Sequence, residues 1–117
     1  MTADADITPA RDADNMRRLA DALRELDARV YTDAVPEGLP FDFTPMTLAR
    51  SDLWHLATLA GRLDFAFVPS STEGYDDLIR SAETFDVFGV RLDVASLEDI
   101  IRSKEARLTV RRIGKTW

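Results

Sequence analysis

The sequence predicts an α+β fold, in which helices pack on a mixed or antiparallel sheet. Several short runs alternate apolar and polar residues, as strands with one buried face do, and two pairs of these runs flank short turns that contain glycine. Other segments repeat apolar residues every three or four positions, which indicates amphipathic helices. In chain order the elements read β-α-β, a loop, β-β, α, β-β and α.

Length and composition fit one globular domain. The chain has 117 residues, of which 45% are apolar and 31% are charged, and these shares are ordinary for a globular protein. It contains no long apolar run, no secretory leader pattern and no cysteine. We therefore expect a cytoplasmic protein with no membrane contact, no disulfide and no zinc–thiolate site.

The charge is distributed unevenly along the chain. A net charge of −6 argues against a basic, nucleic-acid-binding surface over the whole molecule. Basic residues nevertheless gather late, at Arg102, Lys104, Arg107, Arg111, Arg112 and Lys115. We divide the chain into a domain of residues 1–106 and a basic tail of residues 107–117. The tail is either a solvated extension or a local positive patch.

The chain opens with a strand, a helix and a second strand. Pro9 ends the opening strand, because proline cannot continue a ladder of backbone hydrogen bonds. Asp12 or Asp14 can cap a helix over residues 15–27, in which apolar residues recur at helical spacing. A short strand is expected over residues 29–32.

The middle of the chain holds a loop and a hairpin. Residues 33–45 are rich in proline and predict a loop, and residues 46–50 predict one short helical turn. Two strand-like runs, over residues 53–58 and 62–68, flank a turn that contains Gly61. In the second run the phenylalanines share one face, which is the expected core face.

A short helix and a second hairpin follow. Residues 75–81 predict the helix, and residues 85–88 and 90–94 predict two strands around Gly89.

The last predicted helix begins at a capping box, in which Ser96 caps the helix and Asp99 stands at the third helical position. The helix is expected to end near Ala106. Lys104 falls on the same stripe as the apolar residues Leu97, Ile100 and Ile101. A lysine there either extends outward along its apolar stem or reaches a buried anion.

Three aspartates stand at strand positions, where aspartate is unfavourable. Asp4 and Asp6 point to the same face of the opening strand, with Cα atoms about 6–7 Å apart. Asp64 lies in a second strand, opposite the phenylalanines. If the strands are neighbours, the three carboxylates form a hard-cation site suited to a nucleoside triphosphate. The alternative is that Asp4 and Asp6 are solvent-facing residues near the start of the chain.

Two further polar residues stand in the predicted hairpin. Arg62 either meets a phosphate of a bound nucleotide or is a surface arginine beside a turn. His55, the only histidine, could transfer protons, but beside Trp54 it reads as a packing residue. No glycine-rich phosphate loop is present.

Several segments together resemble the nucleotidyltransferase superfamily related to DNA polymerase β. They are T-A-D-A-D-I at 2–7, N-M-R-R-L at 15–19, T-L-A-G-R-L-D at 58–64, G-Y-D-D-L at 74–78 and V-A-S-L-E-D-I-I-R-S-K at 94–104. The later segments are similar to small bacterial members, including the toxin-type nucleotidyltransferases of type IV toxin–antitoxin systems. The resemblance implies a nucleotidyltransferase-like fold.

The resemblance also implies a site and a reaction. Asp4 and Asp6 would hold Mg²⁺ or Mn²⁺ ions that bridge the triphosphate. Asp64 would complete the metal site and help to activate an acceptor hydroxyl, and Lys104 would lie near the phosphates. The hydroxyl would attack the α-phosphorus in line, and pyrophosphate would leave. A tRNA or a protein would be the acceptor, and an antitoxin would be a partner.

Two departures from the family pattern leave open whether the chain is catalytically active. Family members place a Gly-Gly or Gly-Ser turn and a helix before the first aspartates, and many carry Arg-x-Lys-Asp after the last helix. This chain begins on the aspartate motif and ends differently. We therefore expect a truncated domain with weak or absent transferase activity. Two alternatives are a non-catalytic interaction or homodimerisation module derived from the same fold, and an enzyme whose missing parts come from another chain.

Overall fold

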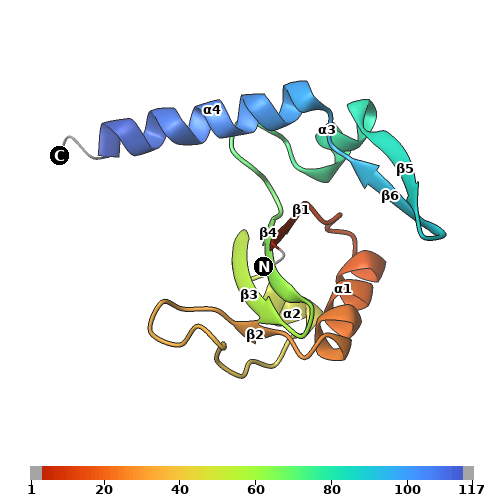
Figure 1. The fold of residues 1–117 in the computed structure, drawn as a ribbon, viewed down its shortest axis with the longest axis vertical. Coiled ribbons are helices and arrows are strands. Elements are labelled where there is room, and N and C mark those ends of the chain that lie inside the picture. The colour runs from red at the N-terminus through yellow and green to blue at the C-terminus, as the bar shows by residue number, and fades with distance from the viewer. Residues whose placement is uncertain (1–3, 115–117) are drawn as a thin grey trace. The chain divides into compact units, whose positions relative to one another are not determined.

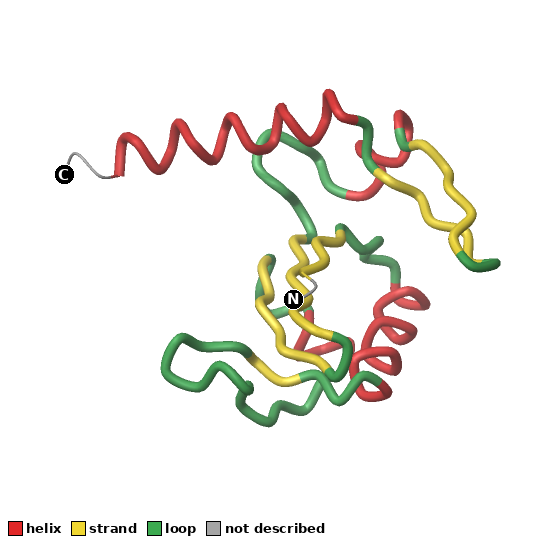
Figure 2. Tube along the Cα trace, in the orientation of Figure 1, coloured by secondary structure: helices red, strands yellow, loops and turns green. Residues whose placement is uncertain are grey.

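A computed structural model of the chain describes residues 4–114, with side chains through residue 105. The chain forms two compact units, residues 1–67 and residues 68–117. Figures 1 and 2 show the elements of each unit.

The first unit is built on a mixed four-stranded sheet in the order β1-β4-β3-β2. The strands are β1 (Asp4–Ile7), β2 (Arg29–Val30), β3 (Leu53–Thr58) and β4 (Gly61–Ala66). β1 runs parallel to β4, whereas β3 is antiparallel to both β4 and β2. The α+β class with a mixed sheet is therefore confirmed for this unit.

Two helices accompany this sheet. Helix α1 (Ala13–Glu25) begins earlier than expected, because Asp12 is the cap and its side chain accepts a hydrogen bond from the Asn15 amide at 2.9 Å. Helix α2 (Pro45–Leu48) is a single turn that Thr44 caps, with proline at its first position.

The core of this unit lies between these helices and one face of the sheet. It consists of Met16, Ala20, Leu23, Ala28, Phe43, Leu48, Leu56, Phe65 and Phe67. Phe65 and Phe67 lie on the expected core face of the second hairpin strand. Because this face of the sheet is closed by apolar packing, the opposite face is the one open to polar chemistry.

The loop after β2 folds back on the sheet. The expected strand over residues 29–32 is only two residues long, because Thr32 already begins a turn closed by the Val35 amide. Gly38 has a φ of +95°, and a Cβ atom there would lie 2.4 Å from Arg29 Cβ. Only glycine fits this close approach, which lets Leu39 bridge to Val30.

The second unit contains short helices, a hairpin and a long helix. Helix α3 (Tyr75–Leu78) continues into the 3₁₀ turn η1 (Ile79–Ser81), and strands β5 (Glu83–Val87) and β6 (Val90–Val94) pair as a separate two-stranded sheet.

Helix α4 (Leu97–Gly114) is longer than expected. The expected end near Ala106 is wrong, since no glycine or proline interrupts the chain before Gly114. The basic side chains expected in the tail of residues 107–117 lie outside the described side chains. No helix within residues 4–114 is long and apolar enough to cross a membrane.

Candidate functional site

The open face of the first sheet brings two of the predicted aspartates side by side. In the parallel pairing of β1 with β4, Asp6 is the partner of Asp64 and Asp4 is the partner of Arg62. Directly paired residues project to the same face of a sheet, and neighbouring strands lie about 5 Å apart. Asp4, Asp6 and Asp64 therefore share one face, and for Asp4 and Asp6 the alternation of the strand predicted this.

The Asp64 carboxylate already has two positive or polar neighbours. His55 Nδ1 lies 3.0 Å from Asp64 Oδ1, and the Arg62 guanidinium Nη2 lies 3.5 Å from the same oxygen. The antiparallel register of β3 with β4 causes the first contact, because it pairs His55 directly with Asp64. Both contacts use the same carboxylate oxygen, Oδ1.

His55 is a polar member of this face and not the packing residue that the sequence suggested. Its side chain is 49% exposed, whereas its neighbour Trp54 packs against the core. Successive strand residues point to opposite faces, so Trp54 and His55 cannot both pack inward.

Arg62 is half-buried on the same face. Its guanidinium carbon lies 3.6 Å from the centre of the Tyr31 ring, which is a cation–π contact. Its Nε is a buried donor with no hydrogen-bond partner among the described residues. An unpaired buried donor costs about 1–3 kcal/mol, and because this nitrogen has almost no exposed surface, a ligand from solution does not reach it without a movement of the side chain. The Arg62 side chain is thus partly buried, and one of its hydrogen-bond donors has no acceptor among the described residues.

The fit of this face to a divalent cation is partial. Asp4 and Asp6 are exposed and Asp64 is half-buried. Among the described residues, no group of three or more histidine, cysteine, aspartate or glutamate side chains is placed to hold a metal ion. The neighbouring Asp6 and Asp64 supply the hard oxygen ligands that Mg²⁺ and Mn²⁺ prefer. The ligand roles of Asp4, Asp6 and Asp64 remain predictions.

Lys104 lies on α4 in the second unit, and its side chain is exposed. Leu97 and Ile101, which were expected to share an apolar stripe with it, are also exposed. The predicted role of Lys104 near the phosphates remains a prediction from the family resemblance.

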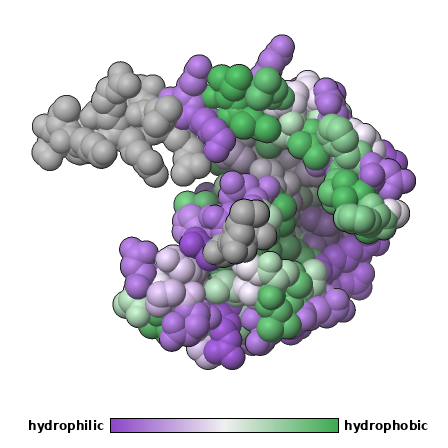
Figure 3. All heavy atoms as spheres, in the orientation of Figure 1, coloured by the Kyte–Doolittle hydropathy of each residue, from purple (hydrophilic) through white to green (hydrophobic). Residues whose placement is uncertain are grey.

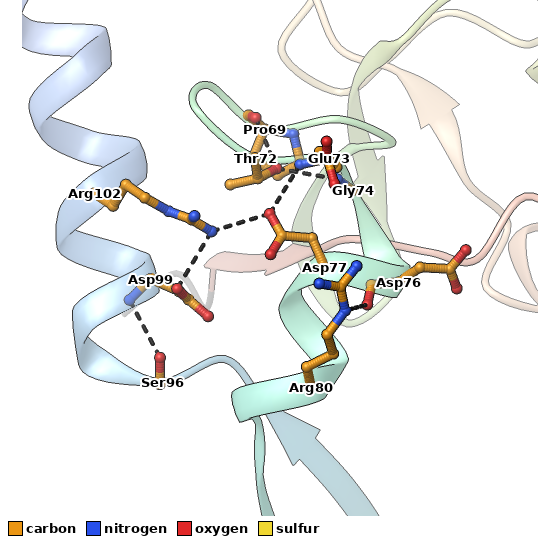
Figure 4. Close-up of polar contacts among 10 residues, drawn as sticks. All are labelled: Pro69, Thr72, Glu73, Gly74, Asp76, Asp77, Arg80, Ser96, Asp99 and Arg102. Atoms are coloured by element: carbon orange, nitrogen blue, oxygen red, sulfur yellow. Dashed lines mark hydrogen bonds and ion pairs between the residues drawn. The ribbon is translucent and has the colours of Figure 1, made fainter.

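A second polar cluster, which the sequence did not suggest, joins α3 to the start of α4 (Figure 4). Asp77 Oδ2 accepts hydrogen bonds from the Glu73 amide at 3.0 Å and from Arg102 at 3.1 Å. Arg102 also pairs with Asp99 at 3.3 Å, and the Asp99 amide donates to the Ser96 hydroxyl as the capping box predicted.

The hydrogen bond from the Glu73 amide, followed by the charge of Arg102, lowers the pKa of Asp77 below its ordinary value. All these contacts lie within the second unit and connect its own helices. The cluster therefore stabilises the unit, and its carboxylates are occupied by backbone and arginine donors.

Comparison of the chain with protein-family models, with curated proteins and with solved structures gives no match. The resemblance to nucleotidyltransferases therefore depends on the sequence motifs alone. What the structure adds is the strand pairing that sets Asp6 beside Asp64.

Proposed function

We propose that the chain is a nucleotidyltransferase-like domain that binds a divalent cation and a nucleoside triphosphate on the open face of the β1-β4-β3-β2 sheet. The observation that carries this proposal is the register of β1 with β4, which pairs Asp6 with Asp64 and Asp4 with Arg62. A fold that only needed solvent-facing residues there has no reason to place two aspartates in direct register.

Electrostatics supports a cation at this face. Two like charges about 5 Å apart repel by about 3 kcal/mol at an effective dielectric of 20 and by about 0.8 kcal/mol in bulk water. A divalent cation held by Asp6 and Asp64, with Asp4 as a further oxygen ligand, turns this repulsion into attraction. Bound Mg²⁺ or Mn²⁺ would supply positive charge to the triphosphate.

Arg62 is suited to the anionic part of the nucleotide. Its ring contact with Tyr31 holds the guanidinium in place beside the Asp64 carboxylate. An arginine presents several donors in a fixed plane, which matches phosphate oxygens.

The proposed reaction transfers a nucleotidyl group to an acceptor hydroxyl. The acceptor oxygen bonds to the α-phosphorus, the bond from that phosphorus to the bridging oxygen breaks, and pyrophosphate leaves. The hydroxyl proton passes to the Asp64 carboxylate. A tRNA or a protein supplies the hydroxyl, and an antitoxin protein would restrain the activity.

Calorimetric titration tests the proposal. Mn²⁺ with a nucleoside triphosphate is titrated into the wild-type chain, into Asp6→Asn and into Asp33→Asn. Asp33 is an exposed aspartate in the loop after β2, so its substitution is a control with the same change in charge. We expect Asp6→Asn to weaken cation binding at least tenfold and Asp33→Asn to leave it unchanged. Equal binding by all three proteins would refute the site.

A further inference from the structure

The β5–β6 hairpin of the second unit has one apolar face and one polar face. Its antiparallel register pairs Phe85 with Leu92 and Val87 with Val90, and directly paired residues share a face. One face therefore carries Phe85, Val87, Val90, Leu92 and Val94, and the other carries Thr84, Asp86, Arg91 and Asp93. The first set, together with Phe88 of the turn, is called the hairpin face below.

The hairpin face is not buried. Exposure of its strand residues ranges from 41% for Val94 to 58% for Val90. Figure 3 shows apolar side chains, in green, gathered over this hairpin at the right of the view. The buried core residues of the chain all belong to the first unit, so within the described part of the second unit no large apolar side chain is buried. A two-stranded hairpin without a covered face is marginal in water.

The turn residue Phe88 adds an independent observation. The residue is fully exposed, and its φ is +51°. A bulky residue at positive φ is a strained choice, since two-residue hairpin turns favour Asn, Asp or Gly there. An aromatic ring that is strained at its backbone and wholly in solvent contributes nothing to the isolated hairpin. Its placement is explained if the ring is buried against a partner.

The area and charge of the hairpin face identify the kind of partner. A whole Phe side chain has about 150–250 Å² of surface, so the half-exposed strand residues and Phe88 together present on the order of 500–600 Å². Exposed apolar patches of this size mark interaction sites. A stable interface covers about 800 Å² on each partner, so this face can form the centre of one.

The face is also free of charge along its strands. Glu83 lies at its open end, paired with Val94, and the other charged hairpin residues lie on the opposite face. A strongly charged partner therefore finds no complementary group along it, whereas a second copy of the same face is complementary in hydrophobicity. Antiparallel stacking of two copies would set the Glu83 carboxylates at opposite ends and leave Asp86 and Asp93 in water.

We propose that the hairpin face is the two-fold interface of a homodimer of this chain. Such an interface uses the same patch on both copies, and two stacked sheets interdigitate their side chains about 10 Å apart. The inference does not depend on nucleotidyl transfer, so either proposal can fail without the other.

Sedimentation velocity on the full chain over a range of concentrations tests the proposal. We expect a reversible dimer for the wild type and at least a tenfold weaker dimer for Phe88→Asn. Asn suits positive φ, so this variant removes the ring without disturbing the turn. Leu92→Asp, in the middle of the face, should abolish the dimer, and Arg91→Gln, on the opposite face of the same strand, should keep it.

Two results would overturn the proposal. One is a wild-type chain that stays monomeric at all concentrations, whether the hairpin face is then covered by another protein or by the chain itself. The other is a dimer whose affinity is the same in Phe88→Asn as in the wild type. Because circular dichroism reports whether each variant is folded, a failure of Leu92→Asp to fold leaves the Phe88→Asn comparison decisive.

Discussion

Replacement of Asp6 by asparagine should have opposite effects on stability with and without a cation. Asp6 is the register partner of Asp64, so the two charges lie roughly one strand spacing, about 5 Å, apart. Asp6 is exposed, so the repulsion is close to its value in water, about 0.8 kcal/mol. Arg62 and His55 beside Asp64 reduce it further. In EDTA, Asp6→Asn should therefore stabilise the chain by at most about 0.8 kcal/mol.

In saturating Mn²⁺ the order should reverse. A ligand at 100 times its dissociation constant stabilises the folded state by about 2.7 kcal/mol. The wild type should gain this stability and Asp6→Asn should gain much less, so the wild type becomes the more stable protein. In a unit of this size 1 kcal/mol corresponds to about 4–8 °C in the unfolding temperature.

Thermal unfolding followed by circular dichroism measures both effects. The control variant is Asp33→Asn, which removes the same charge from a loop and should show neither effect. The reasoning fails if Asp6→Asn is less stable than the wild type in EDTA, because the carboxylate would then be making a favourable contact. It also fails if Mn²⁺ stabilises both proteins equally.

Three further predictions concern a core side chain, a cation–π contact and an ion pair, each of which lies within one of the two units. Leu56→Ala should cost about 2–5 kcal/mol in urea unfolding, because Leu56 is 0% exposed in the core; a cost below 1 kcal/mol would contradict that packing. Arg62→Gln should cost about 1 kcal/mol through loss of the Tyr31 contact, measured against Arg29→Gln on the same face of the sheet, and equal stabilities of the two variants would contradict the contact. Asp77 has a lowered pKa, so its stabilisation is present above the unfolded pKa of about 4 and is lost as pH falls through the lower folded pKa. The hydrogen-exchange protection factors of α3 and α4, which are corrected for the intrinsic exchange rate at each pH, should therefore fall in acid in the wild type and depend less on pH in Asp77→Asn.

Much of the first unit could be predicted from local patterns. The capped helix α1, the β3–β4 hairpin and the core face of β4 each follow from spacing and turn residues that act over short distances. Strand alternation also predicted that Asp4 and Asp6 share a face. The parallel pairing of β1 with β4 joins residues far apart in sequence, and no local rule specifies which strands become neighbours.

The contact between His55 and Asp64 was missed because of the hairpin register. The sequence suggested a turn of three residues over 59–61, whereas the structure pairs Thr58 with Gly61 and leaves a turn of two. A change of one residue in the turn moves side chains to the opposite face relative to their partners. With the two-residue turn, simple counting sets His55 beside Asp64.

In the second unit the elements were predicted better than their burial. The capping box at Ser96 and the turn at Gly89 are local signals, and both are present. The apolar stripe of the last predicted helix suggested a buried face, but Leu97 and Ile101 are exposed. Periodicity shows which face of an element is apolar and does not show what covers it.

Paramagnetic broadening by Mn²⁺ locates a bound cation most directly. Backbone amide signals of the uniformly labelled chain are recorded by NMR as substoichiometric Mn²⁺ is added with a nucleoside triphosphate. If the aspartates of β1 and β4 hold the cation, the amides of residues 4–7 and 62–65 broaden first, and those of the acidic segments at residues 12–14 and 76–77 persist. Broadening that begins at those other segments, or that spreads evenly over the chain, would show that no cation binds at Asp6 and Asp64.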